Sequence, residues 1–299
     1  MRSHRCLVVF PVLLLAFALA RAQTEVTCHI KPFNTVPGPT LRSEGSARSI
    51  NRWGNIVGED AMGRAYVRFV DGRIQLLPIP VPRIQLVEAT KRNAFGVTVG
   101  WLESLSPTRV AELHGFVNTP GVGTRILDIP LVGINRYGTM LGRDASSEGI
   151  VVIRGGKVTH VAIPFEFSRD VELRAISDTG VIVGNYGLQN SPPDPDQTMH
   201  GFVVIKGMFQ DFAFPDPAEN TFITDINASG MIVGVLDGPH AIDSFIFKNG
   251  RFFRPRFILP NGTVAGRSVF IFGVNGFGAI TGTFLFGQTA GPFVGSCDL

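Results

Sequence analysis

Residues 50–58 read INRWGNIVG, and the pattern of this segment returns five more times along the chain. Each copy has an Asn or a Ser, a Gly three residues later, and a short, mostly apolar run that ends in a second Gly. The copies span residues 50–58, 93–100, 134–142, 176–184, 226–234 and 274–282, and their Asn-equivalent positions are 42, 42, 42, 50 and 48 residues apart. A recurring period of this length indicates a repeat architecture.

Each copy of the pattern predicts a β-hairpin. The short side chain of Asn bonds its own backbone two residues on, and Gly supplies a positive φ, so Asn-x-x-Gly is a turn. A second apolar run follows, then a turn such as Asp71-Gly72 or Asn249-Gly250, then a strand that ends at a proline. Each repeat therefore supplies four antiparallel strands, and no helical periodicity persists along the chain.

Six such repeats predict an all-β fold, a six-bladed β-propeller of four-stranded antiparallel blades. A β-solenoid is less favoured, because its coils are usually shorter than these repeats. The sixth repeat ends one strand short at Leu299, while residues 28–37 form an extra run before the first turn. We expect that run to complete the last blade, a closure of three strands plus one.

The amino terminus has the pattern of an export signal. Two arginines in Met1–Arg5 precede an apolar run, Leu7–Leu19, and the small-x-small segment Ala20-Arg21-Ala22. The alternative is a membrane anchor, but the run is about 13 residues long and a spanning helix needs about 20. We expect cleavage after residue 22 and a single propeller domain over residues 23–299. The protein would then be secreted, periplasmic or extracellular, with no membrane insertion of the mature chain.

The charge balance excludes two classes of partner. The chain has 27 Lys and Arg against 24 Asp and Glu, and three of the arginines lie in the expected signal. The remainder is neutral and has no basic block, which argues against nucleic acid and anionic membranes as partners.

Two cysteines remain after the signal, Cys28 and Cys297. In an oxidising compartment a lone pair predicts one disulfide, the alternative being two unrelated thiols. In the closed ring both residues fall where a hairpin turn of the last blade would lie. We therefore predict that they pair and join the two ends of the ring.

A triplet follows the turn in each repeat. It reads His114-Gly115-Phe116 and His200-Gly201-Phe202 in two repeats, and elsewhere Arg64-Ala65-Tyr66, Glu148-Gly149-Ile150, Asp243-Ser244-Phe245 and Gly291-Pro292-Phe293. Turn and triplet together resemble the bacterial extracellular HAF-repeat proteins. The resemblance implies export and propeller-like repeats, and it transfers no catalytic residues, because that family has no settled activity. Since four repeats lack the His, we expect this His to be structural.

Catalytic and cofactor motifs are missing from the sequence. It contains no Gly-x-Ser-x-Gly, His-Glu-x-x-His, Cys-x-x-Cys or phosphate-loop motif. His114 and His200 start equivalent strands of different repeats, so we favour a structural role over metal binding. Asp194-Pro195-Asp196 could suggest calcium, but the neighbouring prolines favour an exposed insertion. We predict no cofactor and no metal.

One position of the turn suggests a binding surface. The residue before the turn Gly is Trp53, Phe95, Tyr137, Thr179, Ser229 and Phe277 in successive repeats, and Arg52 and Arg136 precede two of these. In a closed ring the four aromatic residues belong to neighbouring blades, where they could stack on a sugar or dock an apolar segment of a protein. The alternative, which we favour, is that each ring packs on the adjoining blade.

These observations favour a secreted, non-catalytic binding or scaffold module whose ligand is a glycan or a protein. The alternative is an exported hydrolase or lyase at the channel mouth, because propellers can assemble a site from several blades without any linear motif. Acidic or His side chains converging in the channel would favour the enzyme.

Overall fold

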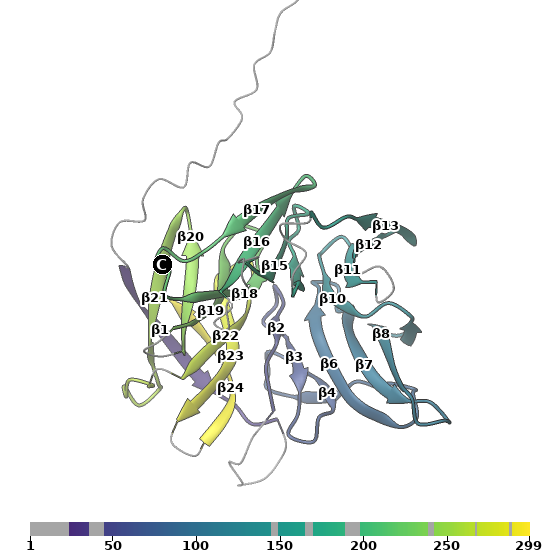
Figure 1. Cartoon of the computed structure of the whole chain (residues 1–299). Helices are drawn as coiled ribbons and strands as arrows, with labels where there is room; N and C mark the ends of the chain where they lie inside the picture. The colour runs from purple at the N-terminus through teal and green to yellow at the C-terminus, as the bar shows by residue number, and fades with distance from the viewer. Residues whose placement is uncertain are drawn as a thin grey trace, which may run out of the picture.

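The described part of the chain is built of β-strands and turns (Figure 1). The computed structural model describes residues 24–35, 45–144, 149–164, 170–188, 198–238, 242–266, 268–286 and 289–299. The expected signal peptide at residues 1–22 lies outside the described residues, as do Pro37, Glu148 and the Asp194-Pro195-Asp196 segment. No helix in the described ranges has the length and apolar character needed to traverse a bilayer.

Four antiparallel sheets contain four strands each, in chain order. The first two sheets contain β2 (Ser49–Ile50), β3 (Ile56–Glu59), β4 (Ala65–Arg68) and β5 (Ile74–Leu76), then β6 (Ile84–Arg92), β7 (Thr98–Leu105), β8 (Ala111–Thr119) and β9 (Gly123–Leu127). The next two contain β10 (Leu131–Ile134), β11 (Met140–Arg143), β12 (Ile150–Arg154) and β13 (Lys157–Val161), then β14 (Glu172–Ile176), β15 (Ile182–Gly187), β16 (Met199–Ile205) and β17 (Met208–Phe212).

A fifth sheet has eight strands. Their spatial order is β18 (Asn220–Ile226), β19 (Ile232–Asp237), β20 (Ile242–Lys248), β21 (Arg251–Ile258), β1 (Thr24–Pro32), β24 (Thr289–Cys297), β23 (Ala279–Phe286) and β22 (Val269–Val274). All its pairings are antiparallel except that between β21 and β1, which is parallel.

The first strands of the six repeats form a closed ring. Strand β2 contacts β6, β6 contacts β10, and the series continues through β14, β18 and β22 back to β2. The remaining strands of each repeat follow outward, which is a propeller-like arrangement of small antiparallel sheets. The predicted all-β class and ring closure are therefore confirmed.

The prediction of six separate blades is wrong in one respect, because the structure has four four-stranded sheets and one eight-stranded sheet. The difference comes from Thr24–His29, which pairs with Phe253–Ile258 in parallel register. Strands β1 and β21 are each the outermost strand of a repeat, so each has an unpaired edge. Where two such edges meet, pairing satisfies both rows of backbone groups.

Strand β1 closes the ring as predicted. It pairs antiparallel with β24, with Cys28 opposite Cys297 and Pro32 opposite Phe293. Cys28 and Cys297 form a disulfide whose Cα atoms are 4.0 Å apart, across a sequence separation of 269 residues. The predicted pairing is confirmed, and both ends of the described chain are tied into one sheet.

The turns have the predicted conformation in all six repeats. The turn glycines, of which Gly54 is the first, have φ between 78° and 83°. In the five repeats that have Asn, its Oδ1 accepts hydrogen bonds of 2.9–3.0 Å from the backbone N–H groups two and four residues on. Ser177 makes the second of these bonds through its hydroxyl.

The same asparagines also connect neighbouring repeats, which the sequence did not reveal. Each carboxamide nitrogen donates to the main-chain oxygen of the equivalent residue in the next repeat, at 2.9–3.4 Å. The bond from Asn275 to Asn51 closes the circle between the sixth and first repeats. Ser177 has no amide to offer, and at that junction buried Asn185 instead exchanges two hydrogen bonds with the backbone of Ile223.

The remaining repeat residues pack each sheet. Phe202, the last residue of its triplet, is fully buried opposite Gly184, the last residue of its turn pattern. A Cβ at Gly184 would lie 2.6 Å from the Phe202 ring and 2.3 Å from the main-chain oxygen of Glu172. Gly is therefore required here because both the ring and the neighbouring strand approach the backbone closely.

Candidate functional site at the channel mouth

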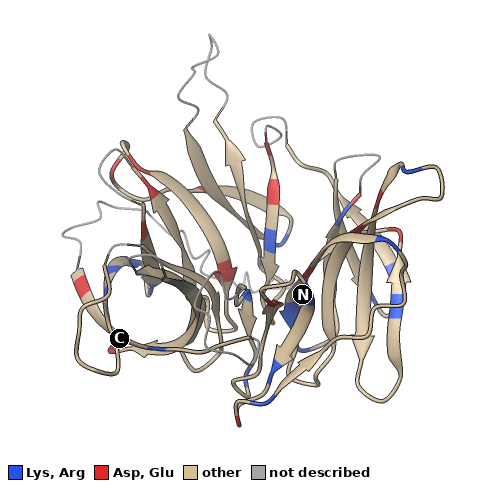
Figure 2. Ribbon diagram, turned by 90° about the horizontal axis from the view of Figure 1, so that it is seen from below, with Lys and Arg blue, Asp and Glu red and all other residues tan. Residues whose placement is uncertain are grey.

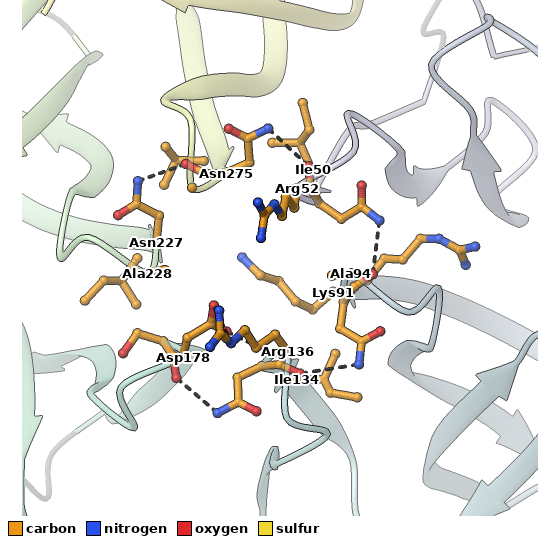
Figure 3. A pocket seen from close by; sticks show the side chains of 18 of the residues that line it. Ile50, Arg52, Lys91, Ala94, Ile134, Arg136, Asp178, Asn227, Ala228 and Asn275 are labelled. Atoms are coloured by element: carbon orange, nitrogen blue, oxygen red, sulfur yellow. Dashed lines mark hydrogen bonds and ion pairs between the residues drawn. The ribbon is translucent and has the colours of Figure 1, made fainter.

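Lys, Arg, Asp and Glu are interspersed along the ribbons of the described sheets (Figure 2). Several charged residues also gather at the end of the central channel at which the six turns meet, namely Arg52, Lys91, Arg92, Arg136 and Asp178. A cavity of about 320 Å³ opens there, lined by the residues that flank the Asn-equivalent positions of all six repeats (Figure 3). We call this cavity and its rim the channel mouth.

The asparagine side chains in the wall of the channel mouth already make hydrogen bonds within the protein. The carboxamides of Asn51, Asn93, Asn135, Asn227 and Asn275 use both their oxygen and their nitrogen in the turn and ring hydrogen bonds described above. Ile50, Ile134 and Ile176 lie between them. The groups left to interact with a ligand are therefore the charged and aromatic side chains of the turns.

An ion pair between the second and the fifth repeat crosses the channel. Lys91 Nζ contacts both carboxylate oxygens of Asp225, which also accept hydrogen bonds from the backbone N–H groups of Ile226 (2.8 Å) and Val274 (2.9 Å). The side chains of Lys91 and Asp225 are 13% and 2% exposed. Replacing one member of a buried, hydrogen-bonded ion pair leaves the other charge without its partner, which lowers the free energy of unfolding by several kcal/mol.

Lys91 and Asp225 occupy the same repeat position, two residues before the Asn, in the second and fifth repeats. The other repeats have Ser49, Gly133, Ala175 and Gly273 at this position. At Gly273 the neighbouring strand approaches closely, since a Cβ there would lie 2.8 Å from the Ser49 Cα atom. The Lys91–Asp225 pair was not predicted from the sequence, although aligning the repeats at this position singles out its two charged members.

A second charged pair lies on the rim. The Asp178 carboxylate accepts a hydrogen bond from the backbone N–H of Arg136 (2.8 Å) and lies 4.0 Å from its Nε. The Arg136 guanidinium carbon lies 4.5 Å from the centroid of the Tyr137 ring. Arg136 therefore has a carboxylate beside it as well as an aromatic ring.

Arg52 has a different environment. Its guanidinium carbon lies 5.4 Å from the Trp53 ring centroid and 5.3 Å from that of Phe277, which belongs to the sixth repeat. In Figure 3 its side chain points toward the axis, as does that of Lys91. No carboxylate of the described residues forms an ion pair with Arg52, so it is a positively charged group held by two rings at an open cavity.

The four predicted aromatic residues are exposed: Phe277 lines the cavity, and the other three each directly follow a residue that lines it. The exposed fractions are 58% for Trp53, 77% for Phe95, 64% for Tyr137 and 72% for Phe277. Trp53 donates a hydrogen bond from Nε1 to the main-chain oxygen of Ala94 in the next repeat (2.9 Å), which fixes its ring. Contacts with the adjoining repeat are the hydrogen bond of Trp53 and the approach of Arg52 to the Phe277 ring, while all four residues are more than half exposed.

A buried arginine adds to the positive charge of the wall. Arg92 lines the cavity at a position where the other repeats have Ile or Val, and it donates a hydrogen bond to the Thr98 hydroxyl (2.7 Å). Burial lowers the pKa of Arg92 because desolvation penalises the charged guanidinium.

The triplet histidines lie away from the channel mouth. His200 Nδ1 is 2.8 Å from an Asp211 oxygen that also accepts from the Tyr186 hydroxyl, and His114 is 3.7 Å from Glu112. Over the ranges that the structure describes, no group of three or more His, Cys, Asp or Glu side chains could hold a metal ion.

Comparisons with known proteins leave the function open. No family model matches the chain, and no curated protein matches it. Among solved structures, a catalytically inactive virginiamycin B lyase from Staphylococcus aureus matches at 10% identity and a TM-score of 0.49, covering 89% of this chain and 99% of its own. The β-propeller domain of the trilobed protease from Pyrococcus furiosus matches at 8% identity and 0.46, covering 84% and 95%.

A gluconolactonase from Xanthomonas campestris matches at 11% identity and a TM-score of 0.44, covering 94% of this chain and 98% of its own. With TM-scores below 0.5, none of these similarities carries an argument about what this chain does.

Proposed function

We propose that this protein is an exported, non-catalytic binding module that holds a glycan at the channel mouth. The observation that carries the proposal is the set of four exposed aromatic rings around an open cavity, with arginines stacked on three of them. Aromatic rings present a large, rigid apolar face at low entropic cost, and sugar rings have a matching apolar face.

The size of the cavity favours a glycan over a protein segment. Small-molecule pockets span about 300–1,000 Å³, and the channel mouth lies within that range. A stable protein interface needs about 800 Å² on each partner, which a recess ringed by single side chains does not offer. A protein ligand remains an outcome of the test.

The carboxylates at the channel have structural partners. Asp178 is bonded to the backbone of Arg136, and Asp225 is held by two backbone N–H groups and Lys91. An exported hydrolase or lyase would use such groups for proton transfer, and nothing about these two favours that role over the binding role. Measured turnover of a bound glycan would support the enzyme instead.

Export and HAF-type repeats are parts of the same proposal. The disulfide between Cys28 and Cys297 is of the kind that persists in oxidising compartments. The turn and triplet patterns support a relation to HAF-repeat proteins. Recovery of the protein from the culture medium or periplasm, with an amino terminus at Gln23, would test the export and the predicted cleavage together.

A glycan array followed by calorimetric titration of the purified oxidised protein tests the binding role. We expect the double variant Trp53→Ser/Tyr137→Ser to bind the best glycan at least ~10-fold more weakly, with little change in melting temperature. Val122→Ser is the matched control, because Val122 is 84% exposed on a turn outside the channel mouth. Unchanged binding with a lowered melting temperature would instead show that the rings only pack against the neighbouring repeat.

A further inference from the structure

The charges of the channel mouth do not balance. Asp225 neutralises Lys91, and Asp178 lies beside Arg136, so each of these cations has a carboxylate partner. Arg52 is left without one among the described residues, and Arg92 adds a further positive charge in the wall. A recess with an excess of one charge concentrates counter-ions, because its low-dielectric walls focus the field.

Arg52 is also held in place before any ligand arrives. The Trp53 and Phe277 rings lie at nearly equal distances from its guanidinium carbon, 5.4 and 5.3 Å, and they come from the first and the sixth repeat. Rings do not accept the guanidinium N–H groups in strong hydrogen bonds, so these groups are left for a ligand. Those groups form a planar fork that fits a carboxylate or sulfate in two parallel hydrogen bonds.

We infer that the channel mouth recognises an acidic sugar, whose carboxylate binds the guanidinium of Arg52 while its ring covers an adjacent aromatic side chain. This inference rests on the proposed glycan-binding function and names the class of glycan. Trp53 and Phe277 are 58% and 72% exposed, so each keeps apolar surface for a sugar beside the Arg52 fork. A uronic acid has both a carboxylate for Arg52 and a sugar ring for the aromatic side chain, whereas an inorganic anion has only the charge.

The Lys91 ammonium lies in the same cavity. In the view down the channel it points toward the axis, as Arg52 does (Figure 3). Its partner Asp225 is 2% exposed, whereas Lys91 is 13% exposed, so the cation is the more accessible member of the pair. Because Asp225 balances the charge of Lys91, the excess positive charge that an anion meets comes from Arg52 and Arg92.

The test compares uronate oligosaccharides with their carboxyl-reduced counterparts, which have the same rings and no charge. Both sets are titrated calorimetrically into the oxidised protein at low and high salt, with inorganic sulfate as a third probe. We expect the acidic oligosaccharide to bind at least ~10-fold tighter than the reduced one. This preference should shrink at high salt because the site is open to solvent.

Arg52→Gln should remove this preference, weakening the acidic ligand by ~10-fold or more while leaving the reduced one unchanged. Arg73→Gln is the matched control: Arg73 belongs to the same repeat and its guanidinium carbon lies 4.3 Å from the Phe69 ring centroid, away from the channel mouth. The control should bind both ligands as the unaltered protein does. Arg52→Lys keeps the charge without the fork, so we expect an intermediate affinity.

Three results would overturn the inference. Equal affinity for acidic and reduced oligosaccharides, or equal weakening of both by Arg52→Gln, would refute acid recognition while leaving glycan binding intact. Sulfate binding as tightly as the uronate would reduce the site to an anion site without sugar recognition. No binding of any oligosaccharide would refute the proposed function and this inference together.

Discussion

The ring of asparagine hydrogen bonds makes a quantitative prediction at the point where the chain closes on itself. Asn275 accepts hydrogen bonds from the backbone N–H groups of Phe277 and Ala279, both at 3.0 Å, and donates one to the main-chain oxygen of Asn51 at 3.1 Å. Asn275 is buried, so Asn275→Ala removes three bonds, of which the one to Asn51 is buried and the two within the turn are partly buried.

The expected cost of Asn275→Ala follows from those three bonds. A net contribution of about 1 kcal/mol for each gives a loss of about 3 kcal/mol in the free energy of unfolding. For a domain of this size that corresponds to a fall in melting temperature of about 6–12 °C. Urea unfolding followed by fluorescence, with the disulfide intact, measures the first quantity, and calorimetry measures the second.

Three companion variants separate the ring from an ordinary turn. Asn261→Ala is the control, because Asn261 caps an exposed turn through one bond to the Thr263 N–H and belongs to no ring. We expect it to cost less than about 1 kcal/mol. Asn275→Ser introduces the side chain found at Ser177. Its loss of unfolding free energy should lie between those of Asn275→Ala and Asn261→Ala. The reverse change, Ser177→Asn, should add about 1 kcal/mol by supplying the missing amide.

The result that would refute this reasoning is specific. If Asn275→Ala costs no more than Asn261→Ala, the bonds between repeats contribute nothing to stability. If Asn275→Ala and Asn275→Ser cost the same, the turn bond that Ser can still make contributes nothing, and the lost bond to Asn51 carries the effect.

Three further predictions concern the closure, the core and a buried acid. Replacing Cys28 and Cys297 together by Ser should lower the free energy of unfolding by about 4–5 kcal/mol, measured in urea, and two reactive thiols in the unreduced protein would contradict the pairing. Gly184→Ala should cost about 1–3 kcal/mol because the new Cβ meets the Phe202 ring and backbone, whereas Gly266→Ala, with open space around it, should cost less than 1 kcal/mol. Burial raises the pKa of the Glu59 carboxyl above 4.5, so its contribution to stability is present below pH 4.5 and is lost as pH rises through the folded pKa. Glu59→Gln should remove this dependence of stability on pH. The urea midpoints of the two proteins should therefore differ by an amount that changes as the pH rises through the folded pKa of Glu59. A difference that stays constant with pH would contradict the prediction.

Much of the fold could be predicted because its signals are local. The bonds of Asn51 to the backbone two and four residues on, and the positive φ of Gly54, depend on neighbours in the sequence. The repeat period then gives the number of strands, and counting the last repeat gives the partner of β1 and the pairing of Cys28 with Cys297.

The candidate site could be predicted only in part. The position of Trp53 and its equivalents follows from the turn, whereas their role as a ligand face stays a prediction. The Lys91–Asp225 pair was not predicted, because its members lie 134 residues apart and meet only across the closed ring. Nor does the sequence tell that Arg52 lies between rings of the first and sixth repeats.

The amino-acid sequence alone determined the repeat, its turns, its strands and the covalent closure, since each depends on short-range geometry or on a regular count. Only the tertiary structure decided that β21 and β1 merge two repeats into one sheet and that an ion pair crosses the channel. It also decided that Arg52 lines the cavity with no carboxylate partner among the described residues. These features arise where residues far apart in the chain are brought together by closing the ring, and no local pattern encodes such distances.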